Sequence, residues 1–264
     1  MSALPSHPST PSTPSPVVLA TLAINGPIAR LTLNRPEQRN ALSVELLASL
    51  HEHVDVLATR TDITCCVLSG AGKSFCAGMD LKLVLGNPPL AEKLLTDLAM
   101  FTLKLRQLPC ITLAVAGGAA IGGGCGIVTV CDLSITHAES KMGFPEVDMG
   151  VCPAVVAPWL CKKVGFGKAR QILLSGGLLS GAQAAAAGIV SDFFATREEM
   201  EAEAEKIAAR LATAAPHALA ATKRLLNELD GSLDEDLLRR AAKISADVLS
   251  TEVSQKMLRA KLGS

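Results

Sequence analysis

Two patterns of apolar residues alternate along the chain as far as residue 195. Short apolar runs predict buried strands, and longer segments whose apolar residues recur at helical spacing predict helices. The predicted strands are residues 17–24, 28–33, 65–69, 111–116, 133–136 and 189–194. The predicted helices are residues 44–58, 90–107, 155–164, 168–174 and 181–187, with a short glycine-led helix ending near Cys131. Alternation of strands with helices is typical of an α/β core.

Residues that favour turns and helix ends support these boundaries. Asn25-Gly26-Pro27 separates the first two strands and predicts a hairpin. Ser43 and Ser180 are the predicted N-caps of two helices, because a serine hydroxyl can accept a bond from a free amide of the first turn. Gly188 ends the second of these helices.

Three regions follow from composition and pattern. Residues 1–16 contain five Pro, five Ser and two Thr and are predicted to be a disordered leader. Residues 17–195 form the predicted core domain. Residues 196–264 are helical throughout, with breaks at Pro216 and Gly231, so they are predicted to form a C-terminal helical subdomain.

An uncharged segment, residues 107–131, is long enough to suggest a membrane span. Six glycines lie in its second half, and each disfavours a helix interior by about 1 kcal/mol relative to alanine. We therefore expect a buried strand, a glycine loop and a short helix, and no membrane association.

Composition narrows the functional classes. The chain has 25 basic and 25 acidic residues, 3% aromatic residues and no tyrosine, which disfavours a nucleic-acid binder. The eight cysteines form no C-x-x-C pair, so reduced thiols in an intracellular protein are expected. The start of the chain resembles neither a secretory signal nor a transit peptide, so a cytoplasmic location is expected.

Several catalytic motifs are incomplete. Gly72-Lys73-Ser74 matches the end of a phosphate-binding loop, but the required first glycine is replaced by Val67. The glycines near residue 124 fail the dinucleotide-binding pattern, because Ile127 stands where the third glycine is needed. The histidines form no cluster with metal-ligand spacing, so no metal site is predicted.

Three segments remain that can carry chemistry: residues 73–82, 117–125 and 142–150. The first two place glycines before a predicted helix, which in the first segment begins at Met79 or Asp80. The first amides of such a helix have no intrahelical acceptor and lie at the positive end of the helix dipole. Two such amides that converge on one point form an oxyanion hole for a carbonyl that becomes an enolate. Glu146, in the third segment, can move the proton.

At these residues the sequence resembles the crotonase (enoyl-CoA hydratase/isomerase) superfamily, over about residues 17–227. The motifs are FCAGMD at residues 75–80, GGG at 122–124 and PE at 145–146, supported by NRP at 34–36, NAL at 40–42 and CD at 131–132. The resemblance implies a superhelix of strand–strand–helix turns with a C-terminal helical oligomerisation region that forms homotrimers or hexamers. It also implies an acyl-CoA thioester substrate, as in fatty acid metabolism, and no cofactor besides the coenzyme A that the substrate carries.

The resemblance also assigns site residues. The oxyanion amides are those of Met79 and Gly123, and the catalytic glutamate is Glu146. The residues implied to contact the substrate or its coenzyme A are Ala41, Ala77, Gly78, Asp80, Lys82 and Gly122.

One position departs from the family pattern. Hydratases of the family with two glutamates carry the first one where this chain has Gly126. Three hypotheses remain open: a hydratase or dehydratase for a less usual enoyl thioester, with Glu146 as the single general acid/base; a Δ3-Δ2-enoyl-CoA isomerase in which Glu146 shuttles a proton; or a catalytically weak binding or scaffold protein that kept the fold.

Asp148 is a candidate for the missing carboxylate. In an extended segment, Glu146 and Asp148 would project to the same side, with Cα atoms about 6.5 Å apart. A solvated or hydrogen-bonded aspartate is the alternative, and the one we favour.

Overall fold

A six-stranded sheet lies at the centre of the protein, in the order β1-β2-β3-β5-β7-β10. The computed structural model describes residues 18–263, so the predicted leader, residues 1–16, lies outside the described residues. The strands are β1 (Ala20–Asn25), β2 (Ile28–Leu33), β3 (Cys65–Gly70), β5 (Ile111–Ala116), β7 (Leu133–His137) and β10 (Asp192–Phe194). β1 and β2 form the predicted antiparallel hairpin, and the other neighbours pair in parallel.

A second sheet of four short strands was not predicted from the sequence. Its strands are β4 (Ser74–Cys76), β6 (Ala119–Ile121), β8 (Lys141–Gly143) and β9 (Leu178–Ser180). Each has three residues, which is too few for an alternating pattern to be recognised. The glycine loop expected after β5 therefore contains a strand.

Three successive segments of the chain contribute one strand to each sheet. β3 is followed by β4, β5 by β6 and β7 by β8, and the first strand of each pair belongs to the larger sheet. Helices follow each pair: α2 (Leu81–Val84) and α3 (Pro88–Gln107), then α4 (Gly123–Val130), then the 3-10 turn η2 (Val147–Met149) and α5 (Ala157–Val164). This repeated strand–strand–helix order is the predicted α/β superhelix.

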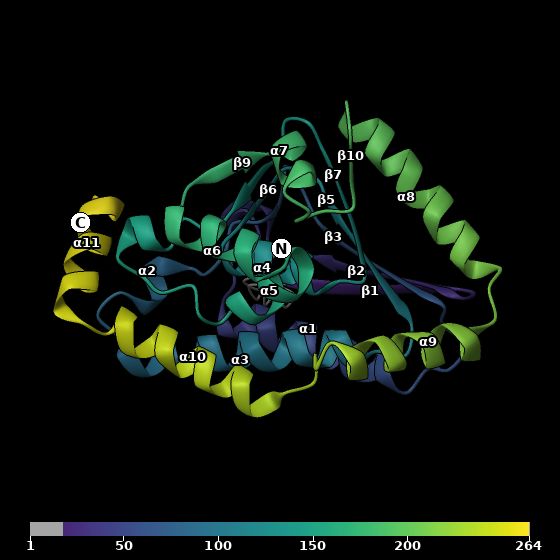
Figure 1. The fold of residues 1–264 in the computed structure, drawn as a ribbon, viewed down its shortest axis with the longest axis horizontal. Coiled ribbons are helices and arrows are strands. Elements are labelled where there is room, and N and C mark those ends of the chain that lie inside the picture. Colours follow the sequence, from purple (N-terminus) through teal and green to yellow (C-terminus); the bar gives the residue numbers. More distant parts are fainter. Residues whose placement is uncertain (1–17, 264) are drawn as a thin grey trace, which may run out of the picture.

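The main hydrophobic core lies between the sheets and the helices α1 (Val44–Ala58) and α3. α1 begins at the predicted cap, since the Leu46 amide donates to Ser43 Oγ at 3.2 Å. A smaller core covers the other face of the large sheet, on the side of α8 (Arg197–Ala212) (Figure 1). Val67, Val115 and Ile135 pack there against Met200 and Ala204 of α8. The remaining short helices are η1 (Pro36–Gln38), α6 (Phe166–Ser175) and α7 (Gly181–Ala186).

The C-terminal region is helical as predicted and consists of α8 (Arg197–Ala212), α9 (Pro216–Leu229), α10 (Glu235–Leu249) and α11 (Glu252–Leu262). The two predicted breaks are present, and a third separates α10 from α11, which Thr251 caps. α10 packs along α3, and α11 contacts η2 (Figure 1). The last helix thus lies at one edge of the molecule, where it contacts the turn that follows Glu146 (Figure 1).

Most predicted boundaries differ from the structure by a few residues, and two of these errors bear on the core or the site. Residues 189–191 do not belong to the last strand, which begins at Asp192, although Ile189 and Val190 are buried. The helix after Gly78 begins at Leu81 and not at Met79 or Asp80, because Met79 forms a strand-like bridge with Leu42. Apart from β6, the uncharged segment folds as expected, and no helix among residues 18–263 is long and apolar enough to cross a membrane.

Candidate active site

Six of the predicted site residues line one pocket of about 550 Å³, a volume that includes its open mouth. They are Ala77, Gly78, Met79, Gly122, Gly123 and Glu146. The other lining residues are Leu81, Leu95, Leu98, Ile121, Pro145, Met149, Val151, Cys152, Pro153 and Val155. Among these described residues Glu146 is the only carboxylate and no side chain is basic. An apolar cavity with few polar groups is typical of a small-molecule site.

The bridge between Met79 and Leu42 fixes one of the two predicted amides. The Leu42 amide donates to the Gly78 carbonyl at 2.8 Å, and the Asp80 amide donates to the Leu42 carbonyl at 3.0 Å. In a parallel bridge of this kind, the residue between the two bonded groups directs its own N–H away from the partner. The N–H of Met79 is therefore not used by this bridge.

The turns at residues 78 and 122 lie side by side. Gly78 has φ +86°, and a Cβ there would lie 2.6 Å from the Ile121 carbonyl oxygen and 3.8 Å from the Gly123 nitrogen. Only glycine fits this conformation and this close approach. Gly123 is the first residue of α4, where an amide has no intrahelical acceptor. The two predicted amides thus come from adjacent turns that line the same pocket.

A buried asparagine holds the loop in front of this turn. Asn40 is fully buried, and its Nδ2 donates to the carbonyls of Ala71, Ser74 and Phe75 at 3.0, 2.9 and 3.1 Å. Its Oδ1 accepts a bond from the Arg35 amide at 2.8 Å. One side chain thereby ties three chain segments together, which explains the asparagine in this motif.

Three predicted residues lie outside the lining of the pocket. Arg35 Nη1 donates to the Ala41 carbonyl at 2.9 Å and to the Asp80 carboxylate at 3.1 Å, so Ala41 and Asp80 share one partner. Lys82 lies on α2 with its side chain exposed to solvent. The Arg35–Asp80 pair therefore supports the turn that carries Met79.

The surroundings of Glu146 favour the protonated form of its carboxyl group. Its Oε2 is buried and has no hydrogen-bond partner within the described part of the chain. Its Oε1 would lie 2.8 Å from a Cβ at Gly122, so the carboxyl group rests against glycine backbone. Burial raises the pKa of Glu146 from 4.5 to about 7, against a smaller opposite effect of a backbone hydrogen bond.

Gly126 has no room for a side chain. A Cβ there would lie 2.4 Å from Val156 Cγ1 and 3.1 Å from Val156 Cβ. Valine therefore occupies the space into which a larger residue at position 126 would project. The packing of α4 against the chain before α5 therefore leaves no space for a carboxylate at position 126.

The extended segment that would make Asp148 a second carboxylate is absent, and the favoured alternative, a hydrogen-bonded aspartate, is observed. Residues 147–149 form the 3-10 turn η2, with the Met149 amide donating to the Glu146 carbonyl at 3.0 Å. Asp148 is exposed, and its Oδ2 accepts a bond from the Gly177 amide at 2.8 Å. The structure does not bring Asp148 to the pocket lining that contains Glu146.

The sequence analysis did not identify the apolar wall of the pocket. Leu95 and Leu98 lie on one face of α3, and their helical spacing could have marked that face as buried. The segment from Val151 to Val155 has no periodic pattern, so no sequence signal could have placed it. All eight cysteines are free, and Cys152 belongs to this wall.

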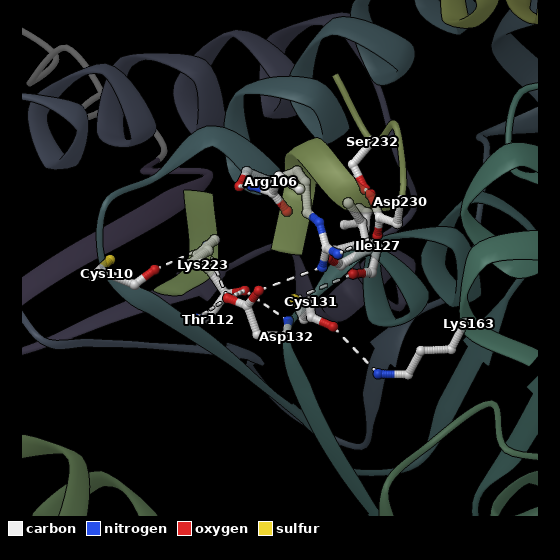
Figure 2. Close-up of polar contacts among 12 residues, drawn as sticks. Arg106, Cys110, Thr112, Ile127, Cys131, Asp132, Lys163, Lys223, Asp230 and Ser232 are labelled. Carbon is white, nitrogen blue, oxygen red and sulfur yellow. Dashed lines mark hydrogen bonds and ion pairs between the residues drawn. The ribbon is translucent and has the colours of Figure 1, made fainter. Parts of the chain in front are cut away.

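A second group of charged residues lies away from the pocket, around Asp132 (Figure 2). Asp132 accepts bonds from the amide and the hydroxyl of Thr112, both at 2.8 Å, and pairs with Lys223 at 2.8 Å. Arg106 reaches Asp132 at 3.4 Å and Asp230 at 3.1 Å. We call these five residues the Asp132 cluster. It joins the ends of α3 and α9 to β5 and β7.

Comparison with known proteins gives a consistent result. Residues 23–261 match the family described as enoyl-CoA hydratase/isomerase. A putative enoyl-CoA hydratase of Thermus thermophilus is 35% identical over 240 residues, covering 89% of this chain and 94% of that protein. The 2,3-dehydroadipyl-CoA hydratase of Escherichia coli is 34% identical over 199 residues, 75% of this chain and 77% of that protein.

The fold agrees with solved structures. An enoyl-CoA hydratase from Bacillus halodurans superposes with a TM-score of 0.84 at 23% identity, covering 92% of this chain and 99% of that one. The crotonase fold predicted from the sequence is therefore confirmed. The chain belongs to the enoyl-CoA hydratase/isomerase family and is an enzyme of that family.

Proposed function

We propose that this enzyme adds water to an enoyl-CoA thioester, or removes it, with Glu146 as the single general acid/base. The proposal rests mainly on the surroundings of Glu146. One oxygen of its carboxyl group is buried without a hydrogen-bond partner in the described chain, and Met79 and Gly123, which carry the two predicted amides, line the same apolar pocket. A pKa of about 7 keeps both protonation states accessible near neutral pH. A group that first accepts and then donates a proton needs this property.

One carboxylate is sufficient for the proposed addition. The oxygen of water bonds to Cβ while one of its protons passes to the Glu146 carboxylate. The electron pair of the carbon–carbon double bond moves towards the thioester, whose carbonyl becomes an enolate. The enolate then takes the proton from Glu146 at Cα and the carbonyl reforms. Water has been added, Glu146 is ionised again, and dehydration is the reverse.

In this scheme the amides of Met79 and Gly123 donate to the enolate oxygen. Donors fixed by the backbone need no reorganisation as the charge develops, and they act strongly in a site that excludes water. Gly78 and Gly122 allow the close approach of the two turns, and Asp80 supports the first of them through Arg35. Every step uses groups of this chain and the substrate alone, so the scheme calls for no cofactor besides the substrate's coenzyme A.

The remaining proposals concern the surroundings of the reaction. Ala77 and Lys82 are proposed to lie near the adenine end of coenzyme A, and Ala41 near its pantetheine arm. We also propose a homotrimer or hexamer built through the C-terminal helices, and a cytoplasmic location.

The charge of the lining suggests the acyl class. The E. coli relative is named for 2,3-dehydroadipyl-CoA, the thioester of a dicarboxylic acid. In this chain no basic side chain is among the described residues of the lining, and a second carboxylate would be buried unpaired near Glu146. Burial of an unpaired charge is strongly unfavourable. The proposed substrate is therefore the thioester of an uncharged enoic acid.

One observation favours a second candidate, a Δ3-Δ2-enoyl-CoA isomerase. Val156 fills the space beside Gly126, so the position implied for a second carboxylate is apolar. An isomerase needs only one carboxylate, which takes the proton from Cα and returns it to Cγ without water. The same Glu146 and the same two amides would serve this reaction.

Separate assays with a 2-enoyl-CoA and a 3-enoyl-CoA distinguish the candidates. Hydration gives a product heavier than the 2-enoyl substrate by one water, and isomerisation converts the 3-enoyl substrate without a change of mass. We expect hydration, and we expect it to be lost in Glu146→Gln. Conversion of the 3-enoyl substrate alone would establish the isomerase. Binding of acyl-CoA without conversion of either substrate would contradict both candidates and favour a scaffold.

A further inference from the structure

One wall of the pocket has no secondary structure of its own. Val151, Cys152, Pro153 and Val155 line the cavity, yet the chain from Val151 to Val155 belongs to no helix or strand. Its first residue is held locally, because the Val151 amide donates to the Glu146 carbonyl at 2.9 Å. The rest of the wall needs contacts from elsewhere to hold one position.

A single hydroxyl from the C-terminal region makes these contacts. Ser245 on α10 is 1% exposed. Its Oγ donates to the Cys152 carbonyl at 2.8 Å and accepts a bond from the Val155 amide at 3.1 Å. The two bonded groups flank Pro153, so Ser245 fixes both ends of the turn that faces the cavity. Both hydrogen-bonding roles of the hydroxyl are used.

The helix that carries Ser245 is itself firmly placed. α10 packs along α3, whose Leu95 and Leu98 line the same pocket. Farther along, Ser254 of α11 donates to the Gly150 carbonyl at 2.5 Å, just before the wall begins. Helices of the C-terminal region therefore determine where the wall lies, although they contribute no residue to the lining.

We propose that Ser245 is a positioning residue that sets the acyl-chain preference of the enzyme by fixing the wall from Cys152 to Val155. The inference rests on the proposed function, because it assumes that this pocket holds the acyl group. Ser245 does not touch Glu146, which is held by its own turn. Loss of the hydroxyl should therefore alter the fit of the acyl chain more than the proton transfer.

Ser245→Ala leaves the Cys152 carbonyl and the Val155 amide buried without partners. Unpaired buried groups are unfavourable, so the wall should move towards water to satisfy them. A short acyl group, which depends on contact with this wall, then loses more than a long one, which has contacts beyond it. We expect KM for crotonyl-CoA to rise about tenfold and kcat to change less than about threefold.

The decisive measurement is the ratio of kcat/KM for trans-2-decenoyl-CoA to that for crotonyl-CoA. We expect this ratio to rise about tenfold in Ser245→Ala, with the pH dependence of kcat unchanged. Ser245→Cys, which keeps a weaker hydrogen-bonding group of similar size, should show a smaller rise. It also provides the test if the alanine variant does not fold.

Ser134→Ala is the matched control. Ser134 is fully buried on β7, and its Oγ has no hydrogen-bond partner among residues 18–263. The control should keep the wild-type ratio. If the Ser245 variants lose thermal stability while the ratio stays within about twofold of wild type, the residue is only structural and the proposal is wrong.

Binding measurements test the proposal for Ser245 independently of the proposed function. Calorimetric titration with butyryl-CoA and decanoyl-CoA gives the same chain-length ratio without turnover. Should the wild type convert no enoyl-CoA, the proposed function fails, yet a shift of the binding ratio in the Ser245 variants would still support the inference. An unchanged binding ratio would overturn it.

Discussion

The pocket around Glu146 and the Asp132 cluster each contain a partly buried carboxylate, but the two carboxylates have opposite surroundings. Asp132 accepts bonds from Thr112 and pairs with Lys223 and Arg106 (Figure 2). Glu146 has a buried oxygen with no partner in the described chain, apolar neighbours and a pKa raised to about 7. One carboxylate is held by hydrogen bonds and ion pairs, and the other is left able to change its protonation state.

The difference separates the structural role of Asp132 from the catalytic role proposed for Glu146. A partly buried charge that has partners of opposite sign joins segments that would otherwise separate, as the Asp132 cluster joins α3 and α9 to β5 and β7. A carboxyl group that the fold leaves unpaired destabilises the folded state, and such groups concentrate at functional sites. Both regions contain a partly buried acidic residue, so burial alone does not distinguish them. Their hydrogen-bond and ion-pair partners do.

Replacing Glu146 should have the largest effect on activity. In Glu146→Gln the side chain keeps its shape but cannot accept the proton, and we expect kcat/KM to fall about a thousandfold, or ~4 kcal/mol. Steady-state kinetics with the preferred enoyl-CoA measures this. The variant should remain folded, as circular dichroism can verify, and retention of more than a tenth of the activity would remove Glu146 from the mechanism.

Breaking the Asp132 cluster should reduce stability and leave chemistry intact. Lys223 is 4% exposed and bonds both Asp132 and the Cys110 carbonyl, the latter at 2.9 Å. Lys223→Met leaves its own buried site without a charge and the partly buried Asp132 carboxylate short of one partner, so we expect the free energy of unfolding in urea to fall by about 3 kcal/mol. kcat should be unchanged at temperatures where the variant is folded.

The matched control for this variant is Lys206→Met, on α8. Lys206 pairs with Glu203 at 3.0 Å on the surface, where ion pairs contribute little. If Lys223→Met is as stable as Lys206→Met, the Asp132 cluster does not hold the C-terminal helices in place.

Stability should also depend on pH through Glu146. The folded pKa of about 7 lies above the reference value of 4.5, so between these values the folded chain binds a proton that the unfolded chain has released. The free energy of unfolding should therefore decrease as pH rises through this interval, by on the order of 3 kcal/mol. Urea titrations of wild type and Glu146→Gln at several pH values test this. Parallel curves for the two proteins would contradict it.

The sequence predicted the larger elements and the motif residues well. Residues 111–116 and the cap at Ser43 were correct because long apolar runs and a capping serine are local signals. The residues 77–79, 122–123 and 146 were brought to one pocket, as the resemblance implied. The four short strands were missed because three residues carry too little pattern.

What the sequence could not supply depends on contacts between distant segments. Val156 fills the space beside Gly126, and Ser245 bonds the wall from Cys152 to Val155, although Val155 and Ser245 are 90 positions apart in the sequence. Neither contact can be recognised from the local composition or from the spacing of residues. Asp148 was considered as a second carboxylate because an extended segment was assumed, and only the turn η2 shows where its side chain lies.

Asp148 gives the smallest predicted effect. Its Oδ2 accepts the Gly177 bond at 2.8 Å, which ties η2 to the chain after α6, and the side chain is exposed. Asp148→Asn keeps one oxygen that can accept this bond, so turnover should stay within about twofold of wild type. The same steady-state assay as for Glu146→Gln provides the measurement. A loss of activity comparable to that of Glu146→Gln would show that a second carboxylate takes part after all, and Glu146 would no longer be the single acid/base that distinguishes the pocket from the Asp132 cluster.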